Sequence, residues 1–157
     1  MENQTQLSFS YIKAEIKTTE YKHYENSVGN NLQSIQITTK CRYDMIKREQ
    51  FKIYCKVAIE EACKRHKIEI KIINVLKEHV HLIVDCPRTM SVAKLMQIIK
   101  GFSSYLLFRL VPNFRKRYPK GHFWSEGYFC ASCGSDYEKA MNYIKNQERH
   151  HNPTLNY

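Results

Sequence analysis

The segment from His79 to Cys86 constrains the fold more than any other part of the chain, because its apolar and polar residues alternate. Successive side chains of a β-strand point to opposite faces of a sheet. The predicted strand therefore has one aliphatic face and one face with two histidines: Val80, Leu82 and Val84 against His79, His81 and Ile83. Pro87 cannot donate a ladder hydrogen bond and ends the strand. We expect helices to cover the aliphatic face and the histidines to lie on the open face.

The other elements are predicted from hydrophobic periodicity and from turn and cap residues. In chain order the elements are a strand at 32–39, a helix at 44–66, strands at 68–76 and 79–86, a helix at 91–111, a strand at 128–133 and a last helix after Gly134 and Ser135. Asp44 and Ser91 are the expected N-caps of the two long helices. The first six elements match a ferredoxin-like, RRM-like α+β fold, with an antiparallel sheet and two helices on one face. The C-terminal helix is expected to cover the other face.

Each helix carries apolar residues at helical spacing, which are expected to form the core. These stripes are Phe51, Tyr54, Val57, Ala58 and Ala62; then Val92, Leu95, Met96, Ile99, Phe102 and Leu106; then Tyr137, Ala140, Met141 and Ile144. The tail from Arg149 to Pro153 is too short and polar for a packed element.

Two short patterns carry the chemistry. His79 and His81 share a strand face with Cα atoms roughly 6.5 Å apart, close enough for both imidazoles to meet one ion. Tyr143 and Gln147 are four residues apart, on one face of a helix. An isolated His-x-His pair is more often a polar surface feature than a metal site, and a tyrosine more often packs in a core. A tyrosine phenol has a pKa near 10, so a nearby cation would help it to react. The two patterns together predict a metal-assisted tyrosine nucleophile.

The charge of the chain indicates a polyanionic partner. Its 157 residues fit one domain, and Lys plus Arg exceed Asp plus Glu by 25 to 15, giving a net charge of +10. Residues 115–124 interleave basic and aromatic side chains, a composition suited to single-stranded nucleic acid. A solvated basic loop is the alternative.

Cysteine usage and hydropathy favour a cytoplasmic protein. The first seventeen residues lack the apolar core of a signal peptide, and no apolar run is long enough to span a membrane. The six cysteines are then expected to be reduced thiols. Cys130 and Cys133 form a CxxC pattern, but in a strand their side chains would face opposite sides, so they are expected to be small buried residues rather than zinc ligands.

Residues 21–150 resemble the HUH-superfamily tyrosine transposases of the TnpA type, encoded by small prokaryotic insertion sequences. The likeness rests on Glu78-His79-Val80-His81-Leu82-Ile83-Val84, on Tyr143-x-x-x-Gln147, on Lys100-Gly101-Phe102-Ser103-Ser104 in the Ser-capped helix, and on Phe123-Trp124-Ser125-Glu126-Gly127-Tyr128-Phe129. It divides the chain into an N-terminal arm, residues 1–20, and one catalytic domain, residues 21–157. The arm is longer than usual, and Lys40-Cys41-Arg42 stands where relatives commonly have Lys-Tyr-Arg.

The resemblance implies a homodimeric nuclease and strand transferase that acts on single-stranded DNA with hairpin ends. His79, His81 and Gln147 would hold Mg or Mn, and Tyr143 would form a 5′-phosphotyrosine. Active sites would be shared between chains, with the histidines of one and the tyrosine of the other. Expected DNA-binding residues are Lys40, Arg42, Lys100, Arg115, Lys116, Arg117, Lys120 and Trp124.

Two alternatives stay open. The first is a domesticated relative that cuts repeated palindromic hairpins without moving its own gene. The second is a non-catalytic RNA-binding module, because RRM domains share the sheet, although the strand at 79–86 lacks the aromatic-rich RRM consensus.

Overall fold

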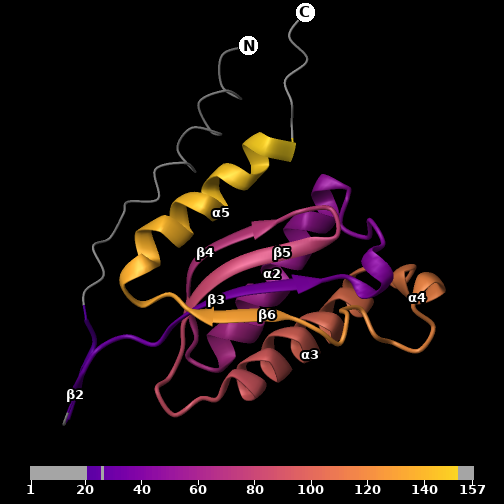
Figure 1. The fold of residues 1–157 in the computed structure, drawn as a ribbon. Helices are drawn as coiled ribbons and strands as arrows, with labels where there is room; N and C mark the ends of the chain where they lie inside the picture. Colours follow the sequence, from indigo (N-terminus) through magenta and orange to yellow (C-terminus); the bar gives the residue numbers. More distant parts are fainter. Residues whose placement is uncertain (1–20, 26, 152–157) are drawn as a thin grey trace, which may run out of the picture.

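A computed structural model describes residues 21–25 and 27–151 and confirms the α+β, ferredoxin-like expectation (Figure 1). Its four-stranded sheet is antiparallel throughout and has the order β4-β5-β3-β6. The strands are β3 (Leu32–Thr38), β4 (Glu69–Val75), β5 (His79–Asp85) and β6 (Phe129–Ser132). A two-stranded hairpin, β1 (His23–Tyr24) with β2 (Ser27–Val28), precedes the sheet. The predicted arm, residues 1–20, lies outside the described residues.

Helices α2 (Glu49–Arg65) and α3 (Val92–Leu110) cover one face of the sheet (Figure 1). The alternation along β5 explains this arrangement, because Val80, Leu82 and Val84 are fully buried against the helices. Ser91 caps α3 as predicted: its hydroxyl oxygen accepts a hydrogen bond of 3.2 Å from the backbone N–H of Lys94. The main core therefore lies between this face and the two helices.

The first long helix differs from its prediction in two respects. It begins at Glu49, after Arg48, and Asp44 makes an ion pair of 3.6 Å with Lys77 instead of capping it. The reason is that the preceding segment packs on the turn between β4 and β5, where Ile46 is buried. The buried face is also rotated: Val57 is 51% exposed, and the buried residues are Cys55, Ala58, Ile59, Ala62 and Cys63.

Helix α5 (Tyr137–His151) lies on the open face of the sheet, as expected, where it contacts β4 and β5, and it follows a short turn, η2 (Gly134–Asp136). Among the described residues, four buried ones form a second cluster between α5 and the sheet: Leu32, Ile83, Cys133 and Ile144. The helix continues to His151, so residues 149–151 of the predicted polar tail extend α5, and the rest of that tail lies outside the described residues. The CxxC residues face opposite sides, since Cys133 joins this cluster and Cys130 packs against the main core.

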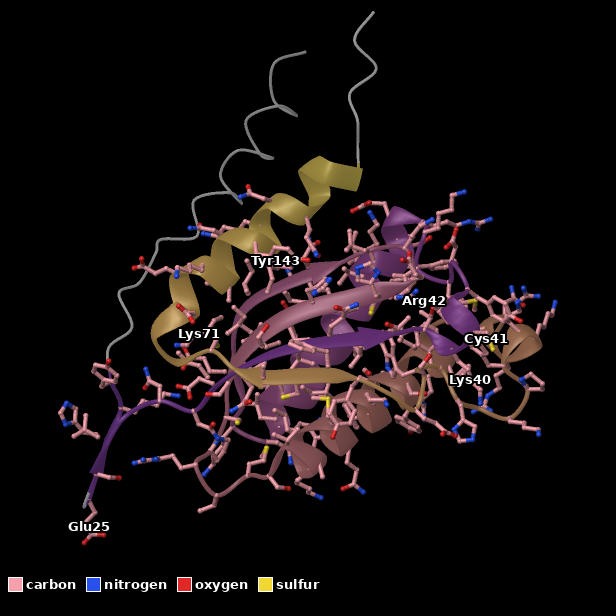
Figure 2. All side chains as sticks on the ribbon, in the orientation of Figure 1. Glu25, Lys40, Cys41, Arg42, Lys71 and Tyr143 are labelled. Carbon is pink, nitrogen blue, oxygen red and sulfur yellow. The ribbon has the colours of Figure 1, made fainter. Side chains whose placement is uncertain are left out.

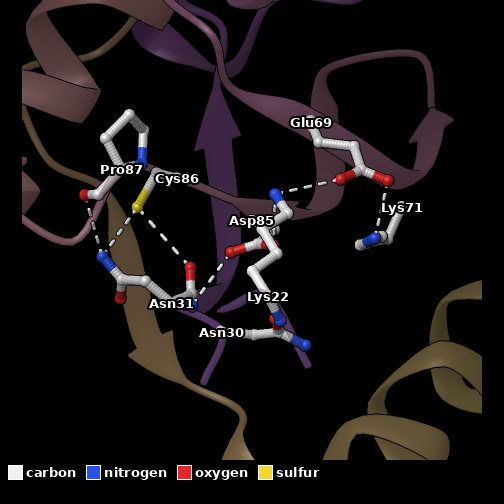
Figure 3. A network of polar contacts seen from close by, with 8 residues as sticks. All are labelled: Lys22, Asn30, Asn31, Glu69, Lys71, Asp85, Cys86 and Pro87. Carbon is white, nitrogen blue, oxygen red and sulfur yellow. Dashed lines mark hydrogen bonds and ion pairs between the residues drawn. The ribbon is translucent and has the colours of Figure 1, made fainter. Parts of the chain in front are cut away.

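A polar network closes the end of the sheet below α5 (Figure 3). The carboxylate of Asp85, 1% exposed, makes an ion pair of 2.7 Å with Lys22 and accepts a hydrogen bond of 2.9 Å from the backbone N–H of Asn31. Lys22 also pairs with Glu69 at 3.1 Å. Because a buried carboxylate is costly without partners, this network anchors the hairpin region to the sheet.

No helix in residues 21–25 and 27–151 is both long enough and apolar enough to cross a membrane.

Candidate active site

The two histidines of β5 lie side by side on the open face, as their spacing predicted. Their ring centroids are 4.9 Å apart, in an edge-to-face arrangement. Antiparallel pairing places His81 opposite Gln36 of β3 and opposite Asn74 of β4, and it places His79 opposite Thr38. The pair therefore occupies the middle of the sheet rather than an edge.

The environment of His81 keeps its imidazole neutral. Burial of the ring, and secondarily the charge of His79, lower the pKa of His81 from 6.5 to about 4. At neutral pH the ring therefore carries a free lone pair, the form in which imidazole binds a metal ion.

His79 is oriented by Glu78, a residue for which the sequence pattern predicts no role. Its Nδ1 lies 2.9 Å from the Oε1 atom of Glu78. A carboxylate in this position holds the imidazole proton on Nδ1 and leaves Nε2 as the metal-binding atom. The only sequence signal for this role is the acidic residue directly before the His-x-His pattern.

Tyr143 approaches the histidines from α5. Its ring centroid lies 6.3 Å from that of His81, and the side chain is 63% exposed, so a substrate can reach the phenol. Ile144, the next residue, holds the helix on the sheet. Its side chain is buried, and its carbonyl accepts a hydrogen bond of 3.2 Å from the side chain of Asn74. Figure 2 shows Tyr143 where α5 passes over the sheet.

Gln147 lies one turn beyond Tyr143, and its side-chain oxygen is buried without a hydrogen-bond partner. Such an oxygen normally costs free energy unless a ligand satisfies it. Within the described part of the chain, no group of three His, Cys, Asp or Glu side chains could hold a metal. Two imidazoles and an amide oxygen nevertheless form a donor set that fits a divalent ion.

His79, His81 and Tyr143 come together within one chain, and Gln147 lies one helical turn beyond Tyr143. The sequence-based hypothesis of a site shared between subunits differs from this arrangement, because here α5 lies on its own sheet and buries Ile144 there.

Basic residues gather at the end of β3, around the short turn η1 (Lys40–Arg42) and helix α4 (Phe114–Arg117). The two segments are joined by hydrogen bonds of 2.8 Å from the Lys40 N–H to the Phe123 carbonyl and of 2.7 Å from the Tyr118 hydroxyl to the Lys40 carbonyl. The exposed members of this group are Arg42, Arg115, Lys116, Arg117 and Lys120.

Four of the predicted DNA-binding side chains have partners within the chain. The guanidinium carbons of Arg115 and Arg117 lie 4.8 Å and 3.8 Å from the ring centroids of Phe108 and Tyr43. Trp124 is 5% exposed, and its indole N–H donates a hydrogen bond of 2.9 Å to the buried hydroxyl of Ser103. Its ring is therefore not available for stacking on a base in this structure, and a role of Trp124 in DNA binding stays a prediction. The ammonium of Lys100 donates to the Glu126 carbonyl at 2.9 Å, and burial lowers its pKa.

The fold and the site define an α+β protein that places a helix-borne tyrosine beside a pair of strand histidines. A family model described as "Transposase IS200 like" matches residues 28–147. The chain belongs to the IS200-like transposase family, as the sequence resemblance indicated.

Sequence relatives include the transposases for insertion sequence element IS200 of Salmonella typhimurium and Salmonella typhi. Each is 28% identical over 89 residues, which cover 57% of this chain and 59% of the relative. The match thus spans about three fifths of the length of these relatives.

Two solved structures share the fold. One, a protein of Deinococcus radiodurans R1 described as a candidate transposase, has a TM-score of 0.67 at 18% identity, over 80% of this chain and 97% of the other. The second, a REP-associated tyrosine transposase bound to a REP hairpin, has a TM-score of 0.57 at 17% identity, over 85% and 74%.

Proposed function

We propose that this protein is a metal-assisted tyrosine transposase, which cleaves and rejoins single-stranded DNA at the ends of an insertion sequence. The observation that carries the proposal is the approach of the Tyr143 ring to within 6.3 Å of the His81 ring, with the unpartnered oxygen of Gln147 one helical turn away. Family membership supports the same function.

The chemistry follows from the residues at the site. His79, His81 and Gln147 would hold a divalent ion, and such an ion supplies Lewis-acid polarisation of a phosphate oxygen. Imidazole ligands also suit Zn or Ni, so the choice of Mg or Mn rests on the resemblance. Glu78 keeps the Nε2 atom of His79 directed to that position.

Tyr143 acts as the nucleophile. Its phenolic oxygen forms a bond to phosphorus, and the bond from phosphorus to the 3′-oxygen breaks. The phenolic proton passes to solvent, and the departing 3′-oxygen takes up a proton. Because one phosphate ester replaces another, the 5′-phosphotyrosine retains the free energy needed to rejoin a strand without ATP.

Hairpin ends are the proposed form of the substrate. The REP-associated relative in the structural comparison is bound to a hairpin, and this chain carries a net charge of +10 with exposed arginines on α4. A homodimer and a cytoplasmic location are part of the proposal, the first from the resemblance and the second from where prokaryotic DNA lies.

The decisive experiment is covalent trapping. Purified protein is incubated with Mn²⁺ and single-stranded DNA from the ends of its own locus, and a protein–DNA adduct is sought on a denaturing gel. Tyr143→Phe should abolish the adduct while DNA affinity stays within about twofold, because only the nucleophilic oxygen is removed. Tyr137→Phe, on the same helix, is the matched control and should still form the adduct. An adduct with Tyr143→Phe would refute the assignment.

A second candidate function is processing of repeated hairpins without mobilisation of the gene, favoured by the likeness to the REP-associated structure. It uses the same residues. Flanking imperfect hairpins and multiple genomic copies of the gene would favour transposition, whereas one copy among dispersed hairpin repeats would favour this alternative.

A further inference from the structure

A groove of about 390 Å³ lies on the open face of the sheet, on the far side of the histidines from α5. Its walls include Gln36 and Thr38 of β3, Arg42 of η1, Phe129 at the start of β6, and Tyr128 directly before that strand. None of these residues except Arg42 was singled out as a binding residue by the sequence.

The register of the strands places two lining residues of this groove opposite the histidines. Gln36 is the partner of His81, and Thr38 is the partner of His79. Gln36 is also the partner of Phe129 on its other side. Partners in an antiparallel pair share one face. The groove therefore begins where the histidine pair ends, above β3 and β6.

Tyr143 lies on the opposite side of the histidines. At the level of His81, α5 is hydrogen-bonded to Asn74 of β4, and β4 and β3 flank β5 from opposite sides. In Figure 2, Tyr143 lies above the β4 side of the sheet and Arg42 lies beyond the end of β3. A phosphate held over the histidines would have the phenol on one side and the groove on the other.

The lining suits a nucleotide. Phe129 is 57% exposed, and an aromatic ring on an open strand face is a stacking platform for a base. Tyr128 is 46% exposed, and its ring lies against the ammonium of Lys100, 5.7 Å from the ring centroid. Gln36 and Thr38 add hydrogen-bonding groups, and Arg42 adds a cation for phosphate.

The backbone at η1 is bent to present Arg42. Cys41 and Arg42 have φ angles of 60° and 53°, a region that costs non-glycine residues free energy. The conformation is held by hydrogen bonds from the Arg42 N–H to the Thr39 carbonyl at 2.9 Å and from the Tyr118 hydroxyl to the Lys40 carbonyl. Strained backbone that its surroundings hold in place often occurs at binding sites. The strain at η1 therefore supports a binding role for Arg42.

We propose that this groove binds the nucleotide immediately upstream of the scissile phosphate, the one whose 3′-oxygen leaves. The inference rests on the proposed function. In phosphoryl transfer the attacking and leaving oxygens lie roughly in line on opposite sides of phosphorus. Since Tyr143 attacks from the α5 side, the 3′-oxygen departs toward β3 and β6, where the groove lies.

This assignment gives the groove a role in rejoining. When the bond from phosphorus to the 3′-oxygen breaks, the upstream strand is no longer covalently attached to the protein, whereas the downstream strand is held by Tyr143. A base stacked on Phe129 would keep the freed 3′-hydroxyl near the phosphotyrosine, so that it can attack when the strands are exchanged.

The test uses DNA from the ends of the locus, after adduct formation with the wild-type protein has mapped the scissile phosphate. Binding is measured by fluorescence anisotropy in the non-cleaving Tyr143→Phe background with Mn²⁺. Three oligonucleotides are compared: the intact strand, one abasic at the upstream nucleotide and one abasic at the downstream nucleotide. The upstream abasic site should weaken binding about tenfold, a typical stacking effect. Adding Phe129→Ala should weaken the intact strand to the same extent and abolish the difference.

Two controls separate stacking from structural damage. Phe129→Trp should restore the sensitivity to the upstream base. Tyr105→Ala removes an aromatic ring of similar exposure, 53%, from α3 on the other side of the sheet and should change nothing. If Phe129→Ala instead abolishes the effect of the downstream abasic site, or changes the effect of neither abasic site, the assignment of the groove is wrong even when the adduct forms. If the wild-type protein forms no adduct, the proposed function itself fails.

Discussion

At the residue scale, an unpartnered atom identifies Gln147 as a ligand candidate more directly than its spacing does. Its side-chain oxygen is buried without a hydrogen-bond partner, beside a tyrosine that lies over two histidines. In a protein interior such atoms are rare, because each one costs the desolvation of a polar group. A divalent ion held by these residues would remove that cost.

We expect Gln147→Ala to weaken Mn²⁺ binding by at least about tenfold, the lower end of what even supporting residues of metal sites contribute. Isothermal titration calorimetry on the DNA-free protein measures this directly. The matched control is Asn146→Ala, an exposed neighbour on α5, which should bind Mn²⁺ like the wild type. Equal affinities for the two variants would count against an ion at this place.

At the scale of the elements, α5 joins the sheet through a small cluster separate from the main core. Among the described residues, Leu32, Ile83, Cys133 and Ile144 are buried in it, and Ile72, Tyr137, Ala140 and Met141 pack around them, whereas the main core lies between α2, α3 and the other face. The position of the nucleophile therefore depends on a cluster much smaller than the main core.

Ile144→Ala should loosen α5 without unfolding the sheet. Removing three carbons from a buried site costs about 2–5 kcal/mol, and here the loss is local. We expect hydrogen exchange of residues 137–147 to accelerate and adduct formation to fall at least about tenfold, since a small displacement of the nucleophile is costly. The exposed residue Asn142 provides the control, Asn142→Ala. An Ile144→Ala protein with full adduct yield would show that this cluster does not position Tyr143.

At the scale of the whole molecule, the positive charge predicts strongly salt-dependent DNA binding. The logarithm of the affinity should fall with the logarithm of the salt concentration, with a slope near 0.7 for each phosphate neutralised on a single strand. Replacing Arg115, Lys116 and Arg117 together by glutamine should flatten this slope by about two if each contacts a phosphate. An unchanged slope would place the DNA path elsewhere, with Lys40 and Arg42 as the next candidates.

The arrangement of α5 within one chain also makes a prediction about assembly. If each site is built from one chain, mixing His81→Ala protein with Tyr143→Phe protein leaves a defect in every site, and the mixture stays inactive. If α5 docks on a partner, as the resemblance implies, the mixed dimer has one intact site and adduct formation returns. Subunit exchange is verified beforehand with two labelled wild-type pools.

The sequence by itself determined the elements, the sheet and the catalytic candidates. Alternation along residues 79–86 separated a core face from a histidine face, and helical spacing placed Tyr143 and Gln147 on one side of the last helix. These features follow from periods of two and 3.6 residues, which are local properties of the chain. Local rules failed at two positions of α2. The helix starts after Asp44 because the preceding segment packs on the turn between β4 and β5, and Val57 is exposed because packing against the sheet sets the buried face.

Only the tertiary structure decided which aromatic and basic side chains are available to a ligand. Trp124 and Phe129 both occur in one aromatic segment, yet Trp124 is buried against Ser103 and Phe129 is 57% exposed, separated from the histidine strand by β3. The difference arises because Phe129 stands opposite Gln36 on the open face of β3. Pairing between strands that are distant in the sequence sets that position, and the periodicity of a single segment cannot predict it.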